Sequence, residues 1–92
     1  MANVKRLVLD VLKPHQPNVL EFSQAIAGAG DSYRVRTTVL EVDENTETLQ
    51  ITVEGDAIDF EAVQSTISGM SGSLHSIDEV EVLGKELENQ GL

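Results

Sequence analysis

The stretch YRVRTTVLEVDENTETLQITVE, residues 33–54, decides the fold because it has the pattern of two strands joined by a tight turn. Residues 33–43 are rich in Val and Thr, and apolar and polar residues alternate in 47–54. The short polar segment 44–46 lies between them and is expected to form the turn. This stretch therefore predicts an antiparallel hairpin.

The alternation also predicts a register for this hairpin. With Asp43 opposite Glu47, the apolar residues of both strands share one buried face. The other expected pairs are Val39 with Ile51 and Arg36 with Glu54.

The segments on either side of the hairpin each predict a strand and a helix. Residues 3–13 alternate as a strand, which Pro14 ends because proline lacks a backbone donor. Asn18 is expected to cap a helix that stops at the small residues 27–30. Asp59 is expected to cap a second helix, whose apolar face contains Phe60, Val63, Ile67 and Met70, and residues 73–83 form the last strand.

The predicted order is therefore βαββαβ, which is the ferredoxin-like α+β architecture. Two right-handed crossovers give a four-stranded antiparallel sheet of order 4-1-3-2, with both helices on one face. Residues 1–84 are expected to form one domain, and 85–92 an acidic C-terminal tail. Because the chain has no cysteine, the name describes topology only and implies no iron–sulfur cluster.

Such a sheet leaves one face bare and two edge strands open. We expect Val8 and Leu12 of the first strand, and Leu40 and Val42 of the second, to lie on that bare face. A monomer would expose them to water, which predicts that another subunit covers them in a homo-oligomer.

The charge balance narrows the functional classes. Sixteen acidic residues against six basic ones give a formal net charge of −10, which disfavours nucleic acid as a partner. No apolar run is long enough for a membrane span. Two interpretations remain open and are compatible: a protein that binds a divalent cation, and a cytoplasmic protein of a halophile whose surface acids keep it in solution.

Three segments carry a family resemblance: LVLDVLKPH (residues 7–15), VEGDAIDFE (residues 53–61) and GSLHSIDEV (residues 72–80). With them the chain resembles the small archaeal family called domain of unknown function 211, over residues 3–84. The resemblance implies a ferredoxin-like fold, ring-like homo-oligomers, bound calcium in some members and no established enzyme activity. Calcium-responsive higher assembly is a further expectation from it.

One cation site is expected where strand ends meet. The first strand is expected to run parallel to the third and antiparallel to the fourth, so its end approaches the end of the third strand and the start of the fourth. The acidic residues gathered there would be Asp10, Glu54, Asp56, Asp59 and Asp78. Asp78 and Glu79 are the strongest ligand predictions because edge-strand carboxylates face a neighbour. The alternative is local pairing, of Glu54 and Asp56 with Arg36 and Arg34, and of Asp10 with Lys13.

Two weaker site predictions remain. His15 and His75 are possible transition-metal ligands or a proton-transfer pair, although two histidines without a third soft ligand make a poor zinc site. Glu41 and Asp43 belong to the acidic hairpin, which could hold calcium weakly or form a solvated charge cluster. No nucleophile elbow or phosphate loop is present, so no enzyme activity is expected.

The leading prediction is thus a calcium-responsive, self-assembling structural protein that forms rings or filaments. A regulatory module that binds a small ligand as a fixed homo-oligomer is the alternative, and it rests on fold analogy.

Overall fold

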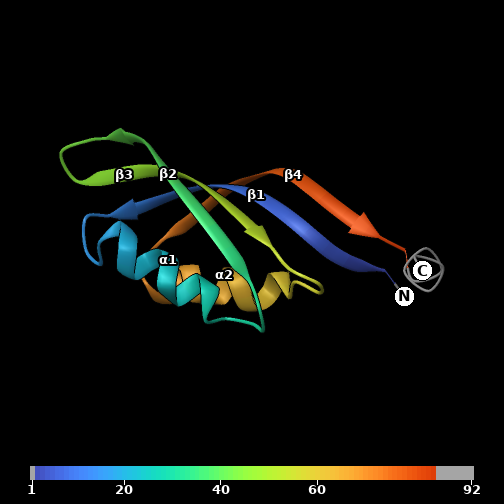
Figure 1. Cartoon of the computed structure of the whole chain (residues 1–92). Coiled ribbons are helices and arrows are strands. Elements are labelled where there is room, and N and C mark those ends of the chain that lie inside the picture. The colour runs from blue at the N-terminus through green and yellow to red at the C-terminus, as the bar shows by residue number, and fades with distance from the viewer. Residues whose placement is uncertain (1, 85–92) are drawn as a thin grey trace.

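A computed structural model of the chain describes residues 2–84, and the predicted tail 85–92 lies outside the described residues. Four strands form one sheet, and two helices cover one of its faces (Figure 1). The elements are β1 (Asn3–Pro14), α1 (Val19–Ala27), β2 (Arg34–Val42), β3 (Thr46–Glu54), α2 (Phe60–Gly69) and β4 (Ser73–Leu83). The sheet order β2-β3-β1-β4 confirms the predicted α+β, ferredoxin-like fold.

Both helices begin at the predicted caps. The Asn18 side chain accepts a hydrogen bond from the Glu21 amide (2.8 Å), and the Glu21 carboxylate accepts one from the Asn18 amide (3.3 Å). Asp59 accepts a hydrogen bond from the Ala62 amide (3.1 Å) at the start of α2. These contacts satisfy amides that the first turn of a helix leaves without partners.

The core lies between the helices and the covered face of the sheet. Alternate residues of β1 and β3 face the helices, and each helix adds two buried side chains from one stripe. The buried cluster comprises Leu7, Leu9, Val11, Phe22, Ile26, Leu49, Ile51, Val53, Ile58, Val63 and Ile67.

The direction of β3 corrects one prediction. β1 and β3 are antiparallel, with Arg6 opposite Glu54 and Lys13 opposite Glu47. A crossover through α1 makes β2 parallel to β1, and the hairpin then reverses the chain, so β3 must run against both. The expectation that the first and third strands are parallel was wrong, and the end of β1 meets the start of β3.

The hairpin register also differs from the prediction, by two residues. Val39 pairs with Leu49 and Arg34 with Glu54, and an irregularity between Val39 and Glu41 leaves Leu40 without a partner in the ladder. A shift of two residues keeps every side chain on the same face, so alternation cannot distinguish the two registers. The bulge then changes the face of the residues that follow it.

Exposed apolar side chains are concentrated on the two edge strands. The sheet is longer than the helix layer, so the strands extend past α1 and α2 at both ends (Figure 1). Six of the eight exposed large apolar residues within 2–84 lie on β2 or β4. They are Val39, Leu40 and Val42 on β2, and Ile77, Val80 and Val82 on β4.

Two of the four predicted interface residues behave differently from expectation. Val8 is only 6% exposed, although it lies on the face without helices, between Thr52 and Glu79 of the neighbouring strands. Val42 is exposed but pairs with Glu47, which places it on the helix side after the bulge. Leu12 and Leu40 are exposed, as expected.

Candidate functional site

The predicted acidic cluster does not form, because it depended on a parallel β3. Glu54 lies at the opposite end of β1 from His15 and makes a 2.6 Å ion pair with Arg6. Asp10 lies opposite Gln50 and Ser76 in mid-sheet. Asp56 is exposed in the loop before α2, and Asp59 caps that helix. The predicted local pairs also differ, since Glu54 bonds Arg6 rather than Arg36 and Lys13 bonds Glu47 rather than Asp10.

Asp78 and Glu79 lie exposed on the edge strand β4, as expected. Asp78 accepts a hydrogen bond from the Ser76 hydroxyl (2.7 Å), and Glu79 pairs with the Arg6 Nε (3.1 Å). Within residues 2–84 of one subunit, no three His, Cys, Asp or Glu side chains gather closely enough to hold a metal ion. Neither carboxylate is therefore part of a complete intramolecular site in the described chain.

A charge cluster around the buried Lys13 at the end of β1 was missed. The Lys13 side chain is fully buried, and its Nζ lies 3.0 Å from Glu47 Oε1, 2.7 Å from the Pro14 carbonyl oxygen and 5.8 Å from the Phe22 ring centroid. Lys13 continues the buried series of Leu7, Leu9 and Val11, and that alternation was the signal in the sequence.

His15 completes this cluster from the other side of Glu47. Its Nδ1 lies 3.0 Å from Glu47 Oε2, and its Nε2 lies 2.9 Å from the Glu44 carbonyl oxygen. Both ring nitrogens face acceptors, which favours the imidazolium because only that form donates from both. The hydrogen bond to Glu47 accordingly raises the pKa of His15 above 6.5. The hydrogen bonds from His15 and then Lys13 lower the pKa of Glu47 below 4.5.

His75 is separate from this cluster. It lines a shallow hollow of about 260 Å³ with Asp10, Leu12 and Thr48, on the face of the sheet without helices. His15 contacts Glu47 on the helix side, so the two histidines do not form a pair. Glu41 pairs with Thr48 near the hairpin end, and the Asp43 amide closes the turn to the Thr46 carbonyl oxygen (2.8 Å).

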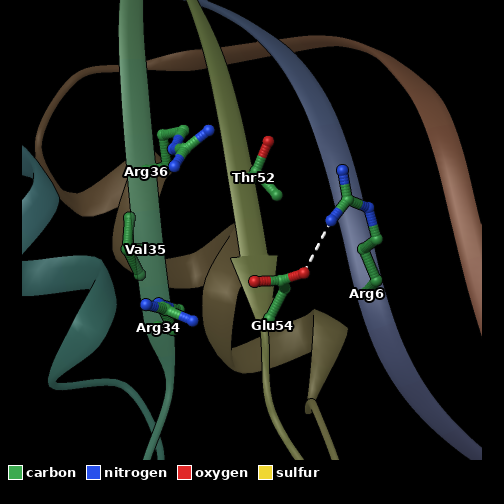
Figure 2. Close-up of a pocket in the computed structure, with 6 residues that line it drawn as sticks. All are labelled: Arg6, Arg34, Val35, Arg36, Thr52 and Glu54. Atoms are coloured by element: carbon green, nitrogen blue, oxygen red, sulfur yellow. Dashed lines mark hydrogen bonds and ion pairs between the residues drawn. The ribbon is translucent and has the colours of Figure 1, made fainter.

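The second feature missed from the sequence is a pocket of about 300 Å³ on the face without helices. It is lined by Arg6, Arg34, Val35, Arg36, Thr52 and Glu54 (Figure 2). Arg6 is held by Glu54 and by Glu79, and these contacts raise its pKa further. Arg6 lies on β1, whereas Arg34 and Arg36 lie on β2, which follows α1 in the chain. The sheet order places only β3 between these two strands, and this brings the three arginines together.

The observed fold with two open edges is that of a small ferredoxin-like α+β protein. Residues 5–91 match the model of the family DUF211, described as "Uncharacterized ArCR". The chain is also 39% identical over 87 residues to an uncharacterized protein of Methanocaldococcus jannaschii, a match that covers 95% of this chain and 89% of that relative. The chain belongs to the DUF211 family, and the family predicted from the three motifs is confirmed.

Among residues 2–84, the features suited to binding are therefore the two apolar edge strands and the arginine-lined pocket. No helix among residues 2–84 is long and apolar enough to cross a membrane.

Proposed function

We propose that the protein is a self-assembling module whose subunits join edge to edge, with β2 of one subunit against β4 of the next. The observation that carries this proposal is the placement of three exposed apolar side chains on each edge strand: Val39, Leu40 and Val42 on β2, and Ile77, Val80 and Val82 on β4. An open edge offers unpaired backbone donors and acceptors to a further strand. Joining two different edges is a heterologous contact, which closes into a ring or continues as a filament.

The energetics are consistent with a specific contact. A fully buried valine side chain contributes about 1.5–3 kcal/mol, so burying one that is half exposed contributes about 1 kcal/mol. Val80 is 51% exposed and Val42 63% exposed. Six such side chains per contact contribute roughly 6 kcal/mol, to which backbone hydrogen bonds along the joined edges add. The cost of association is estimated at about 4–15 kcal/mol, which is similar in size to this gain. Because gain and cost nearly balance, the loss of one buried side chain is expected to weaken the contact strongly.

Val42→Lys and Val80→Lys test the contact, because each blocks one edge and leaves the other intact. Each variant alone is expected to be monomeric in light scattering after size exclusion. A 1:1 mixture is expected to form dimers, since the intact β4 edge of the first variant fits the intact β2 edge of the second. Leu20→Lys is the matched control, because Leu20 is 66% exposed but lies on α1.

The outcomes separate the possible contacts. If only one of the two edge variants dissociates, the contact joins two copies of the same edge. Unchanged mass in both variants would refute edge-to-edge assembly.

Calcium is the regulator in this proposal. Asp78, Glu79 and Glu81 are exposed on β4, where the next subunit would approach, and clustered carboxylates repel one another until a divalent ion neutralises them. The bridging ion takes carboxylate ligands from two subunits. The support is this placement, together with the calcium that the family resemblance implies for some members.

The calcium test is particle mass in concentrated KCl with calcium, with magnesium and with a chelator. Growth in calcium alone is expected, and the double variant Asp78→Asn, Glu79→Gln is expected to abolish it while remaining folded. Growth that survives both substitutions would exclude these two residues as the bridge. Equal mass in all three solutions would favour halophilic adaptation as the reason for the acidity.

A second candidate function is a ligand-binding module of fixed oligomeric state, and the arginine-lined pocket favours it. A small ligand would stabilise the particle without changing its mass, whereas a bridging ion would enlarge it.

A further inference from the structure

All three arginines of the chain line one pocket. Arg34 and Arg36 come from β2 and Arg6 from β1, and β3 lies between them with Thr52 and Glu54 (Figure 2). The register explains the convergence, since Glu54 is the partner of both Arg34 and Arg6, and Arg36 lies opposite Thr52. Cross-strand partners project from the same face, so the guanidinium groups gather on the face without helices.

We propose that this pocket binds a small oxyanion with at least two negative charges, carried by phosphate or carboxylate groups. The proposal does not rest on edge-to-edge assembly, although the pocket shares β2 with the proposed contact and its Arg6 is held by Glu79 of β4.

Charge is the first argument for the proposal. The six lining residues carry a net charge of +2, whereas the whole chain carries −10. Arg34 and Arg36 make no side-chain hydrogen bond or ion pair with any described residue, although sixteen carboxylates occur in the chain. Two neighbouring cations that pair with no carboxylate of residues 2–84 repel each other, and an anion between them removes that repulsion.

Geometry is the second argument. Glu54 and Glu79 hold Arg6 through Nη1 (2.6 Å) and Nε (3.1 Å), so its guanidinium is fixed in position. Guanidinium groups bind carboxylate and phosphate oxygens through paired N–H donors. The Thr52 hydroxyl adds a further donor in the lining.

Size selects the ligand class. A volume of about 300 Å³ is at the lower end of the range for small-molecule pockets. The lining is mainly charged and polar, with Val35 the one apolar residue in it, so charge rather than apolar contact would determine the affinity. These features fit a compact, highly charged molecule.

Isothermal titration calorimetry at constant ionic strength tests the site, with pyrophosphate and citrate as separate probes. We expect saturable binding of at least one probe, and the stronger one identifies phosphate or carboxylate as the preferred group. Arg36→Gln and Arg34→Gln are each expected to weaken binding about tenfold or more, because each removes a charge-assisted donor pair. Both residues are exposed, so neither substitution disturbs the core.

Lys5→Gln is the matched control, since it removes the same charge from β1 but lies outside the lining. Equal weakening by Lys5→Gln and the arginine variants would show a general charge effect and would overturn the proposal, as would no binding of either probe.

The same variants distinguish this proposal from self-assembly. If Arg34→Gln and Arg36→Gln lower particle mass while the wild type binds neither probe, the patch receives an acidic segment of a second subunit. That result would overturn the anion site and leave edge-to-edge assembly standing.

Discussion

Replacing Gly72 with alanine places a methyl group against two buried core side chains, Phe22 and Ile67. The new Cβ would lie 2.9 Å from Ile67 Cγ2, 3.0 Å from Phe22 Cζ and 3.1 Å from the Ile67 carbonyl oxygen. Phe22 and Ile67 are fully buried, so neither side chain can turn toward solvent. The Gly72 amide also donates to that same carbonyl oxygen (2.9 Å), which holds the backbone in place. The neighbours therefore cannot move apart without loss of packing.

The magnitude follows from two opposing effects. Overpacking a well-packed core costs about 1–3 kcal/mol. Removing a glycine from the unfolded chain returns about 0.4–1 kcal/mol. The expected net loss is about 1–2 kcal/mol in the free energy of unfolding, which lowers the Tm of a domain of this size by roughly 5–15 °C.

Gly69→Ala is the control for Gly72→Ala. Gly69 is exposed at the end of α2, and a Cβ there would meet nothing within 4 Å. Alanine is expected to raise stability by up to about 1 kcal/mol because it favours the helix. Urea unfolding of both variants at one protein concentration measures the difference. If Gly72→Ala is as stable as Gly69→Ala, the close approach at Gly72 does not exist and the reasoning fails.

Two further predictions concern polar contacts. The raised pKa of His15 stabilises the fold fully below pH 6.5, and this stabilisation is lost as the pH rises through the folded-state pKa. The lowered pKa of Glu47 means that its carboxylate contributes its full stabilisation of the fold above pH 4.5. This stabilisation is lost as the pH falls through the folded-state pKa. Thermal unfolding should therefore show greater stability at about pH 5.5 than at about pH 8.5. His15→Gln should reduce this difference in stability between the two pH values. An unchanged difference would rule out His15 as its source. Tyr33→Phe should cost about 1 kcal/mol in urea unfolding, because the Tyr33 hydroxyl accepts a hydrogen bond from the Asp59 amide (2.7 Å); an unchanged midpoint would refute that role.

The elements and the fold class were predictable because they depend on local patterns. Alternation identified the strands, one apolar stripe identified each helix, and Asn18 and Asp59 marked the helix starts. The family was predictable from three short motifs. Each of these features is determined by residues close together in the chain.

The contents of the sites were less predictable. Lys13 could have been assigned to the buried face from its place after Leu7, Leu9 and Val11, but its partner Glu47 is 34 residues away. The acidic cluster was placed wrongly because β3 was predicted to run parallel to β1, whereas the two strands are antiparallel. One reversed strand moves Glu54 from one end of the sheet to the other.

By itself the sequence determined which segments become strands and helices and where the helices begin, because hydrophobic periodicity and capping act over a few residues. Only the tertiary structure decided the hairpin register, the bulge at Leu40 and the gathering of Arg6, Arg34 and Arg36 around Glu54. A register shift of two residues preserves the face of every side chain, and strand order joins residues that are distant in the chain. The register and the strand order both depend on packing across the whole sheet.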